Sequence, residues 1–244
     1  MLAKFVHWKV YAMKQIISFT IWLGFVSVAL SPVVNAGAGS PAKHLAVSVW
    51  NVSGTDSLRP VTGGVPFARG AAPDGVHFAM CDEKNKDVPL QAPVLARWKD
   101  GSARWVLLDF QARVAPESVA QFRLSWGEKT AASGPSFPVV VDRLGKPSLR
   151  TGNTVVEATQ DALLRISDRV DLKLALTDGE GRECTAITES IEVQTEGQMR
   201  SALLLRGAFR DLDGQRVLGF RMRASIFAGL SKVCLEPQIL VDSE

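Results

Sequence analysis

Apolar and polar residues alternate with a period of two along much of the chain. The alternation is clearest in residues 45–50, 170–177 and 217–227. A period of two places successive side chains on opposite faces of a β-strand, whereas an amphipathic helix repeats near 3.6. Residues 157–166 suit a helix by composition but lack that repeat. The pattern predicts an all-β fold of many short strands, arranged as a barrel or a sandwich.

Turn-forming residues separate the predicted strands. Glycine and proline are dense between residues 60 and 75, which excludes a helix there and indicates loops between short strands. Asp100-Gly101 lies between two strand-like runs, 94–99 and 103–114, and predicts a β-hairpin.

Small and polar residues at 131–135 mark the best internal boundary. We therefore predict two β domains joined by a linker. The predicted segments are a leader at 1–36, a short linker at 37–43, a first domain at 44–130, a second linker at 131–150 and a second domain at 151–244.

The first 36 residues have the three parts of a secretory signal peptide. Three lysines (Lys4, Lys9 and Lys14) precede an apolar run at 16–30, and small residues occupy positions −3 and −1 relative to a cleavage site after Ala36. The apolar run has 15 residues, whereas a membrane-spanning helix needs about 20. The pattern favours a cleaved helical signal and export to the periplasm or outside the cell. A retained anchor is the alternative, and no membrane association is expected after cleavage.

The net charge of +3 comes entirely from this leader. The chain has 28 Lys+Arg and 25 Asp+Glu, and the leader holds three of the basic residues and none of the acidic ones. The remaining 25 basic and 25 acidic residues balance. Nucleic-acid binding needs a cationic footprint that releases counterions, so we expect no nucleic-acid partner.

Catalytic and metal-binding motifs are absent from the sequence. After the leader there are only two histidines, His44 and His77, and there is no GxSxG, HExxH or Walker sequence. Three cysteines lie far apart, with no CxxC, which argues against zinc. We predict no cofactor, no metal and no catalytic residue. The cysteines are expected to be buried thiols, with one disulfide as the alternative.

Residues 96–111 hold the densest cluster of aromatic and basic side chains. With a two-residue turn, Arg97 would lie opposite Arg104, and Trp98 and Trp105 would share one face. With a three-residue turn, Arg97 would instead face Trp105 as a cation–π pair. Indole rings suit sugar rings, and guanidinium groups suit uronate carboxylates. The candidate carbohydrate-binding residues are therefore Arg97, Trp98, Arg104 and Trp105.

A purely structural interpretation of this hairpin is also open. The tryptophans could fill a small barrel, and the arginines could pair with Asp82, Glu83 or Asp87. The leader contains the chain's single tyrosine, which is a further argument against a broad aromatic sugar-binding cleft.

Three segments together resemble the front of the exo-rhamnogalacturonan lyase family. They are residues 60–70 (PVTGGVPFARG), 88–91 (VPLQ) and 96–111 (ARWKDGSARWVLLDFQ). The resemblance implies an N-terminal RIFT-type β-barrel, then a β-sandwich, then a large α/α barrel that carries the catalytic groups. Residues 233–244 are similar to a strand of the family's second β domain. The family often has histidine where Pro237 stands, and proline predicts an edge strand or a bulge.

The resemblance implies a chain made of the barrel and a partial antiparallel sandwich, truncated before the α/α barrel. No catalytic residue can then be assigned to it. The expected role is the non-catalytic part of an exported lyase-like protein acting on rhamnogalacturonan or a pectin-type uronate polysaccharide. Its partners would be that polysaccharide and the missing C-terminal domains, in the same protein or an adjacent gene product. The alternatives are a stand-alone secreted binding module and a truncated product without independent function.

Overall fold

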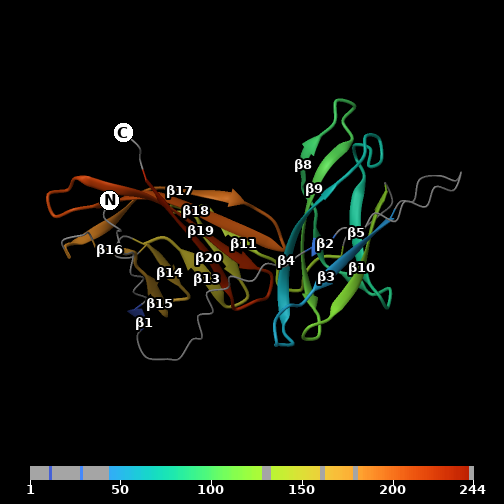
Figure 1. Cartoon of the computed structure of the whole chain (residues 1–244), viewed down its shortest axis with the longest axis horizontal. Coiled ribbons are helices and arrows are strands. Elements are labelled where there is room, and N and C mark those ends of the chain that lie inside the picture. Colours follow the sequence, from blue (N-terminus) through green and yellow to red (C-terminus); the bar gives the residue numbers. More distant parts are fainter. Residues whose placement is uncertain are drawn as a thin grey trace, which may run out of the picture. The chain divides into compact units, whose positions relative to one another are not determined.

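A computed structural model describes residues 11–12, 28–29, 44–127, 133–159, 163–177 and 181–241 (Figure 1). Every regular element in these residues is a β-strand, so the all-β prediction is confirmed. They contain no helix of the length and apolarity needed to cross a membrane. Apart from the short strands β1 (Tyr11–Ala12) and β2 (Val28–Ala29), the predicted signal helix lies outside the described residues. The chain divides into two compact units, Leu23–Pro135 and Ser136–Glu244 with Met1–Trp22.

The described residues of the first unit form nine strands in two sheets. One sheet has the order β2-β3-β10-β5-β6, and the other has the order β4-β9-β7, with β8 also paired to β9. Beyond β2, the strands are β3 (His44–Trp50), β4 (Leu58–Pro66), β5 (His77–Asp82), β6 (Asp87–Val88), β7 (Leu90–Gln91), β8 (Val94–Arg97), β9 (Ala103–Arg113) and β10 (Val119–Gly127).

Alternate residues of these strands form one apolar core. In β9 the inward positions include Val106, Leu108 and Phe110, all at most 2% exposed. Phe67 packs edge-on against Trp126, with ring centroids 5.0 Å apart. Residues 60–66 of the Gly/Pro-rich segment belong to strand β4, so the expectation of loops is wrong for them and right for residues 67–75. This loop bonds to the barrel, since the Trp126 Nε1–H donates to the Ala71 carbonyl at 2.8 Å. The period of two thus determines which side chains fill the barrel.

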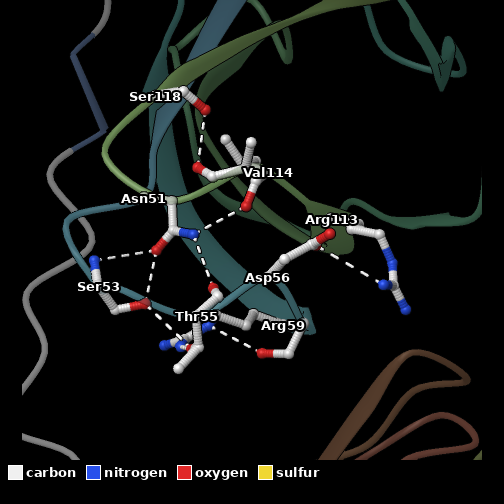
Figure 2. Close-up of polar contacts among 10 residues, drawn as sticks. Asn51, Ser53, Thr55, Asp56, Arg59, Arg113, Val114 and Ser118 are labelled. Carbon is white, nitrogen blue, oxygen red and sulfur yellow. Dashed lines mark hydrogen bonds and ion pairs between the residues drawn. The ribbon is translucent and has the colours of Figure 1, made fainter.

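Asn51 connects the loop after β3 with the turn between β9 and β10 through hydrogen bonds (Figure 2). Its side-chain amide donates to the carbonyls of Val114, at 2.8 Å, and Thr55, at 3.0 Å. Its Oδ1 accepts the backbone N–H and the hydroxyl of Ser53, and its own N–H donates to the Ser118 carbonyl. The side chain is 8% exposed, so these bonds satisfy polar groups that water reaches poorly. The loop after β3 is thereby tied to the β9–β10 turn.

The second unit is a β-sandwich. A six-stranded sheet has the order β1-β15-β14-β13-β12-β11, and a five-stranded sheet has the order β16-β17-β18-β19-β20. Its strands beyond β1 are β11 (Val140–Asp142), β12 (Ser148–Thr151), β13 (Thr154–Glu157), β14 (Leu164–Ile166), β15 (Val170–Leu172), β16 (Ala175–Thr177), β17 (Glu183–Thr195), β18 (Arg200–Arg210), β19 (Arg216–Phe227) and β20 (Val233–Leu240).

The two sheets enclose a separate core. Leu149 and Val156 from the first sheet join Leu203, Leu205 and Phe220 from the second in one buried cluster. All neighbouring strands are antiparallel, as predicted for this domain. The sandwich prediction is therefore confirmed.

Strand β20 forms one edge of the five-stranded sheet, where it pairs with β19. Pro237 lies in this strand opposite Met222. Proline has no backbone N–H to donate, so an edge strand is the position that tolerates it best. The edge position expected from Pro237 is the one observed.

The three cysteines are free, and they differ in burial. Cys184 is buried in the sandwich core, as expected for an inert thiol. Cys81 is half-buried and Cys234 is exposed, so the expectation of burial is wrong for these two. Partial desolvation, followed by the nearby carboxylate of Glu236, raises the pKa of the Cys234 thiol. A raised pKa keeps this thiol protonated and weakly nucleophilic.

Candidate functional site

The predicted hairpin turn contains three loop residues. The Trp98 N–H donates to the Ser102 carbonyl at 2.8 Å, and the Gly101 N–H donates to the Trp98 carbonyl at 3.0 Å. Gly101 has φ of 84°, in the left-handed region that favours glycine. This is the three-residue loop in which a turn is followed by a left-handed glycine. The two-residue alternative is wrong.

Asp100 organises this turn through its carboxylate. One oxygen accepts the Ser102 N–H at 3.0 Å and the Ser102 hydroxyl at 2.6 Å, and the other accepts the Arg69 Nε–H at 3.0 Å. The Ser102 hydroxyl in turn accepts the Gly70 N–H. Hydrogen bonds from Ser102, and then the interaction with Arg69, lower the pKa of Asp100 below its usual range. The turn is thereby joined to the Gly/Pro-rich loop.

Replacing Asp100 by asparagine should remove a pH-dependent opening of this hairpin. The pKa of the Asp100 carboxyl is lower in the folded than in the unfolded chain, so its stabilisation is complete above the unfolded pKa. It is lost as pH falls through the folded pKa. An NMR titration of the Trp98 indole N–H should show this acid transition in the wild type and not in D100N. Asp87→Asn, a matched change at an exposed residue, should retain it; an unaltered titration in D100N would contradict the assignment.

The register of the hairpin differs from both sequence-based alternatives. Arg97 lies opposite Ala103, and Ala96 lies opposite Trp105, with a register shift between the two pairs. Arg104 is thus the extra residue of a β-bulge. The predicted Arg97–Arg104 and Arg97–Trp105 pairings are both wrong, because the loop comprises residues 99–101 and Arg97 is therefore opposite Ala103, before the bulge is reached.

The two arginines have partners that the sequence did not indicate. The Arg97 guanidinium lies 2.7 Å from Asp74 and donates to the Gly101 carbonyl at 2.8 Å. Arg104 stacks over Trp98, with its guanidinium carbon 4.9 Å from the ring centroid. A cation–π pair is therefore present, but between different residues from those expected.

The carboxylates proposed as alternative partners make other contacts. Asp82 accepts the backbone N–H groups of Lys84 and Lys86, and Glu83 accepts the N–H of Gln121. Asp87 lies in the short strand β6. The structural interpretation of the hairpin is thus right that Arg97 pairs with a carboxylate, but the carboxylate is Asp74 and not one of the three proposed. For Arg104 it is wrong, since the contact of this residue is with the Trp98 ring.

The two tryptophans of the hairpin have different environments. Trp98 is half-buried, and its Nε1–H donates to the Phe67 carbonyl at 3.0 Å. Trp105 is 42% exposed and lies across Gly64 of β4. A Cβ at Gly64 would be 2.4 Å from the Trp105 Nε1 atom, so only glycine permits this position. A glycine within a strand pattern is a signal of such close approach.

A row of polar residues crosses the same sheet. Asp109 lies between Thr62 of β4 and Gln91 of β7 in the strand register, and the Thr62 hydroxyl donates to the Asp109 carboxylate at 2.6 Å. Asp109 and Trp105 have the same parity along β9, so both belong to the outer face of this sheet. This row was not predicted from the sequence, although Asp109 and Gln111, two polar residues at alternate positions of an otherwise apolar strand, are a signal for it.

The outer face of β4, β9 and β7 therefore combines the exposed indole of Trp105 with the Thr62 hydroxyl and the Gln91 amide. The Asp109 carboxylate, which accepts from Thr62, is itself only 1% exposed. An indole provides a flat apolar surface for the C–H face of a ring, and the polar row provides hydrogen bonds in fixed directions. Arg97 and Arg104 lie on the hairpin that begins next to Trp105. The pairing of the strands places these aromatic, polar and basic side chains relative to one another.

The geometry of the first unit defines an all-β domain of the barrel class. Residues 46–125 match the PcRGLX-like N-terminal RIFT barrel domain. The match confirms the RIFT barrel that the resemblance to rhamnogalacturonan lyases implied. No curated protein matches the chain.

Proposed function

We propose that this chain is the non-catalytic N-terminal portion of an exported polysaccharide lyase-like protein acting on rhamnogalacturonan or a related pectin-type uronate polysaccharide. The match of residues 46–125 to the PcRGLX-like N-terminal RIFT barrel domain supports this role. β-Elimination next to a uronate carboxyl needs a base and a group that neutralises the carboxylate. We place those groups in C-terminal domains of the same protein or of an adjacent gene product.

The proposal has a direct enzymatic test. β-Elimination leaves a carbon–carbon double bond in the product, which is detected by its ultraviolet absorbance. The chain alone, incubated with rhamnogalacturonan, is expected to give no such absorbance. Formation of unsaturated product by the chain alone would show that it contains catalytic groups and would overturn the non-catalytic assignment.

A stand-alone secreted carbohydrate-binding module is the second candidate function. The observation in its favour is the exposed indole of Trp105, held against Gly64 on the same face as the Thr62–Asp109–Gln91 row. The two candidates differ in the gene downstream of the chain. A continuation that encodes helical hairpins supports the lyase-like protein or a truncated product, whereas a clean stop followed by intergenic sequence supports the module.

Both candidates predict that Trp105 contributes to sugar binding. Trp105→Ala should weaken binding of uronate-containing oligosaccharides about tenfold, which corresponds to about 1.4 kcal/mol, because the ring loses its stacking surface. Trp50→Ala is the matched control, since Trp50 is 49% exposed in the same unit but lies on β3. Calorimetry measures both. Equal losses in the two variants, or no binding at millimolar ligand by folded protein, would contradict this site.

A further inference from the structure

The outer face of the five-stranded sheet of the sandwich is formed by alternate residues of its strands. Leu203 and Leu205 of β18, and Phe220 and Met222 of β19, point into the core. The residues between them therefore face away from it. This places Arg206, Arg221 and Arg223 on the outer face, where Arg206 and Arg221 are exposed and Arg223 is half-buried.

Charge is segregated across this sheet. The two inner strands, β18 and β19, contain six arginines and no acidic residue or lysine, namely Arg200, Arg206, Arg210, Arg216, Arg221 and Arg223. The strands on either side, β17 and β20, contain the glutamates and no basic residue, namely Glu183, Glu189, Glu192 and Glu236. The middle of the sheet is thus a band of positive charge with negative charge along its borders.

The border glutamates compensate only part of this charge. Arg206 lies 2.8 Å from Glu192, and Arg223 lies 3.2 Å from Glu236. Arg221 donates its Nε–H to the amide oxygen of Gln238 at 2.7 Å. Within the part of the chain that the structure describes, no carboxylate forms an ion pair with Arg221.

The register brings like charges together at the centre of the band. Arg206 lies directly opposite Arg221, and Arg223 is two residues further along the same strand. Like charges opposite one another in a sheet are destabilising. Leu204 lies opposite Arg223 in the register and is 2% exposed. An arginine stem is sufficient to cover such an apolar residue, and this role does not require a second positive charge. An anion bound between the two guanidinium groups removes the repulsion.

We propose that Arg206, Arg221 and Arg223, which we call the arginine strip, bind carboxylates of a linear uronate polysaccharide. The choice of this polyanion rests on the proposed function. Planar guanidinium groups bind carboxylates bidentately. Side chains two residues apart on one strand are about 6.8 Å apart, and those on neighbouring strands about 5 Å apart. A repeating polymer can engage several such groups at once, and avidity compensates for the weakness of each exposed contact.

The proposal is tested on the full chain with polygalacturonate. Arg206→Gln/Arg221→Gln should weaken binding at least tenfold at low ionic strength, and added salt should weaken wild-type binding. Arg143→Gln/Arg165→Gln is the matched control, with the same change in net charge and with both arginines exposed or half-buried in ion pairs of the same unit. The single variant Arg221→Gln, which disrupts only the contact with Gln238, serves if the double variant does not fold.

Two further ligands decide whether carboxylate is the group recognised. Fully methyl-esterified polygalacturonate has the same backbone without charge and is expected not to bind the strip. Single-stranded DNA of similar charge is expected to bind more weakly than polygalacturonate. Equal binding of DNA, equal binding of the ester, or equal affinity of the strip variants and their control would overturn the proposal.

The Trp105→Ala variant in the same assay separates this proposal from the barrel site. Loss of binding in Trp105→Ala alone would leave the barrel site standing and overturn the strip. Loss in the strip variants alone would support the strip and overturn the barrel site. Wild-type protein that is folded and binds no polygalacturonate would overturn both.

Discussion

Replacing Gly207 by alanine is expected to unfold the sandwich unit at a much lower temperature than in the wild type. A Cβ at this position would lie 2.1 Å from the carbonyl oxygen of Ile187 and 2.6 Å from the ring of Phe220. The carbonyl belongs to the paired strand β17, and Phe220 is 1% exposed in the core, so neither can give way without breaking other contacts. We expect a loss of about 3 kcal/mol, which lowers the midpoint by roughly 12–24 °C.

Because of where the tryptophans lie, the unfolding of the barrel unit can be measured separately from that of the sandwich unit. After the leader, the tryptophans are Trp50, Trp98, Trp105 and Trp126, all in the barrel unit. Tryptophan fluorescence therefore follows the barrel, whereas far-ultraviolet circular dichroism follows the strands of both units. Gly207→Ala should shift a transition in dichroism and leave the fluorescence transition in place.

Gly54→Ala provides the control for Gly207→Ala. Gly54 is exposed, and an added Cβ there would have no neighbour within 4 Å. Its thermal transitions should match those of the wild type. If Gly207→Ala also matched the wild type, strands β17 and β18 could not be packed as closely as the structure shows.

Leu124→Ala should destabilise the barrel unit and leave the sandwich unit unaffected, which is the opposite of the effect of Gly207→Ala. Leu124 is fully buried in β10, between β3 and β5, and belongs to the barrel core. Its truncation leaves a cavity in the centre of that core, and we expect a loss of about 3–4 kcal/mol. The fluorescence transition should move to a much lower temperature, while the dichroism transition of the sandwich remains.

Leu95→Ala is the matched control for this second variant. Leu95 is 57% exposed on β8 of the same unit, so its truncation should cost little. Together, Gly207→Ala and Leu124→Ala test whether the two buried clusters unfold separately. Transitions that shift together in both variants would show a single cooperative unit instead.

Local sequence patterns indicated several of the strands and turns of the fold, but not strand β4, whose glycines and prolines predicted loops. Alternation of apolar and polar residues indicated strands, because one face of a half-buried strand packs against the core and the other contacts water. Asp100-Gly101 indicated a turn because glycine adopts the positive φ that the turn needs. Pro237 indicated an edge because proline cannot donate to a ladder on both sides. Each of these inferences depends on a few neighbouring residues.

The contacts of the candidate site depended on residues far away in the sequence. The bulge at Arg104 is associated with two backbone bonds outside the hairpin, from Phe67 to the Arg104 carbonyl and from Ala103 to the Ala72 carbonyl. These bonds interrupt the regular register that the sequence analysis assumed. The predicted arginine pairings failed because the loop comprises residues 99–101, which places Arg97 opposite Ala103, although the hairpin itself was correctly located.

The surfaces proposed for binding were likewise decided by strand pairing. Gly64 and Trp105 are distant in sequence, and only the pairing of β4 with β9 brings them together. The opposition of Arg206 and Arg221 requires the register of β18 and β19. Alternation shows which side of its own strand a residue occupies, but not which residue of another strand lies beside it.

The sequence alone determined the all-β class and the position of the hairpin, because these follow from local periodicity and turn chemistry. The RIFT barrel was implied by the resemblance of three segments to a known family. Only the tertiary structure decided that Arg104 stacks on Trp98, that Trp105 lies over Gly64 and that arginines form a strip on the sandwich. Those arrangements result from long-range register, in which a shift of one residue moves every side chain to the opposite face.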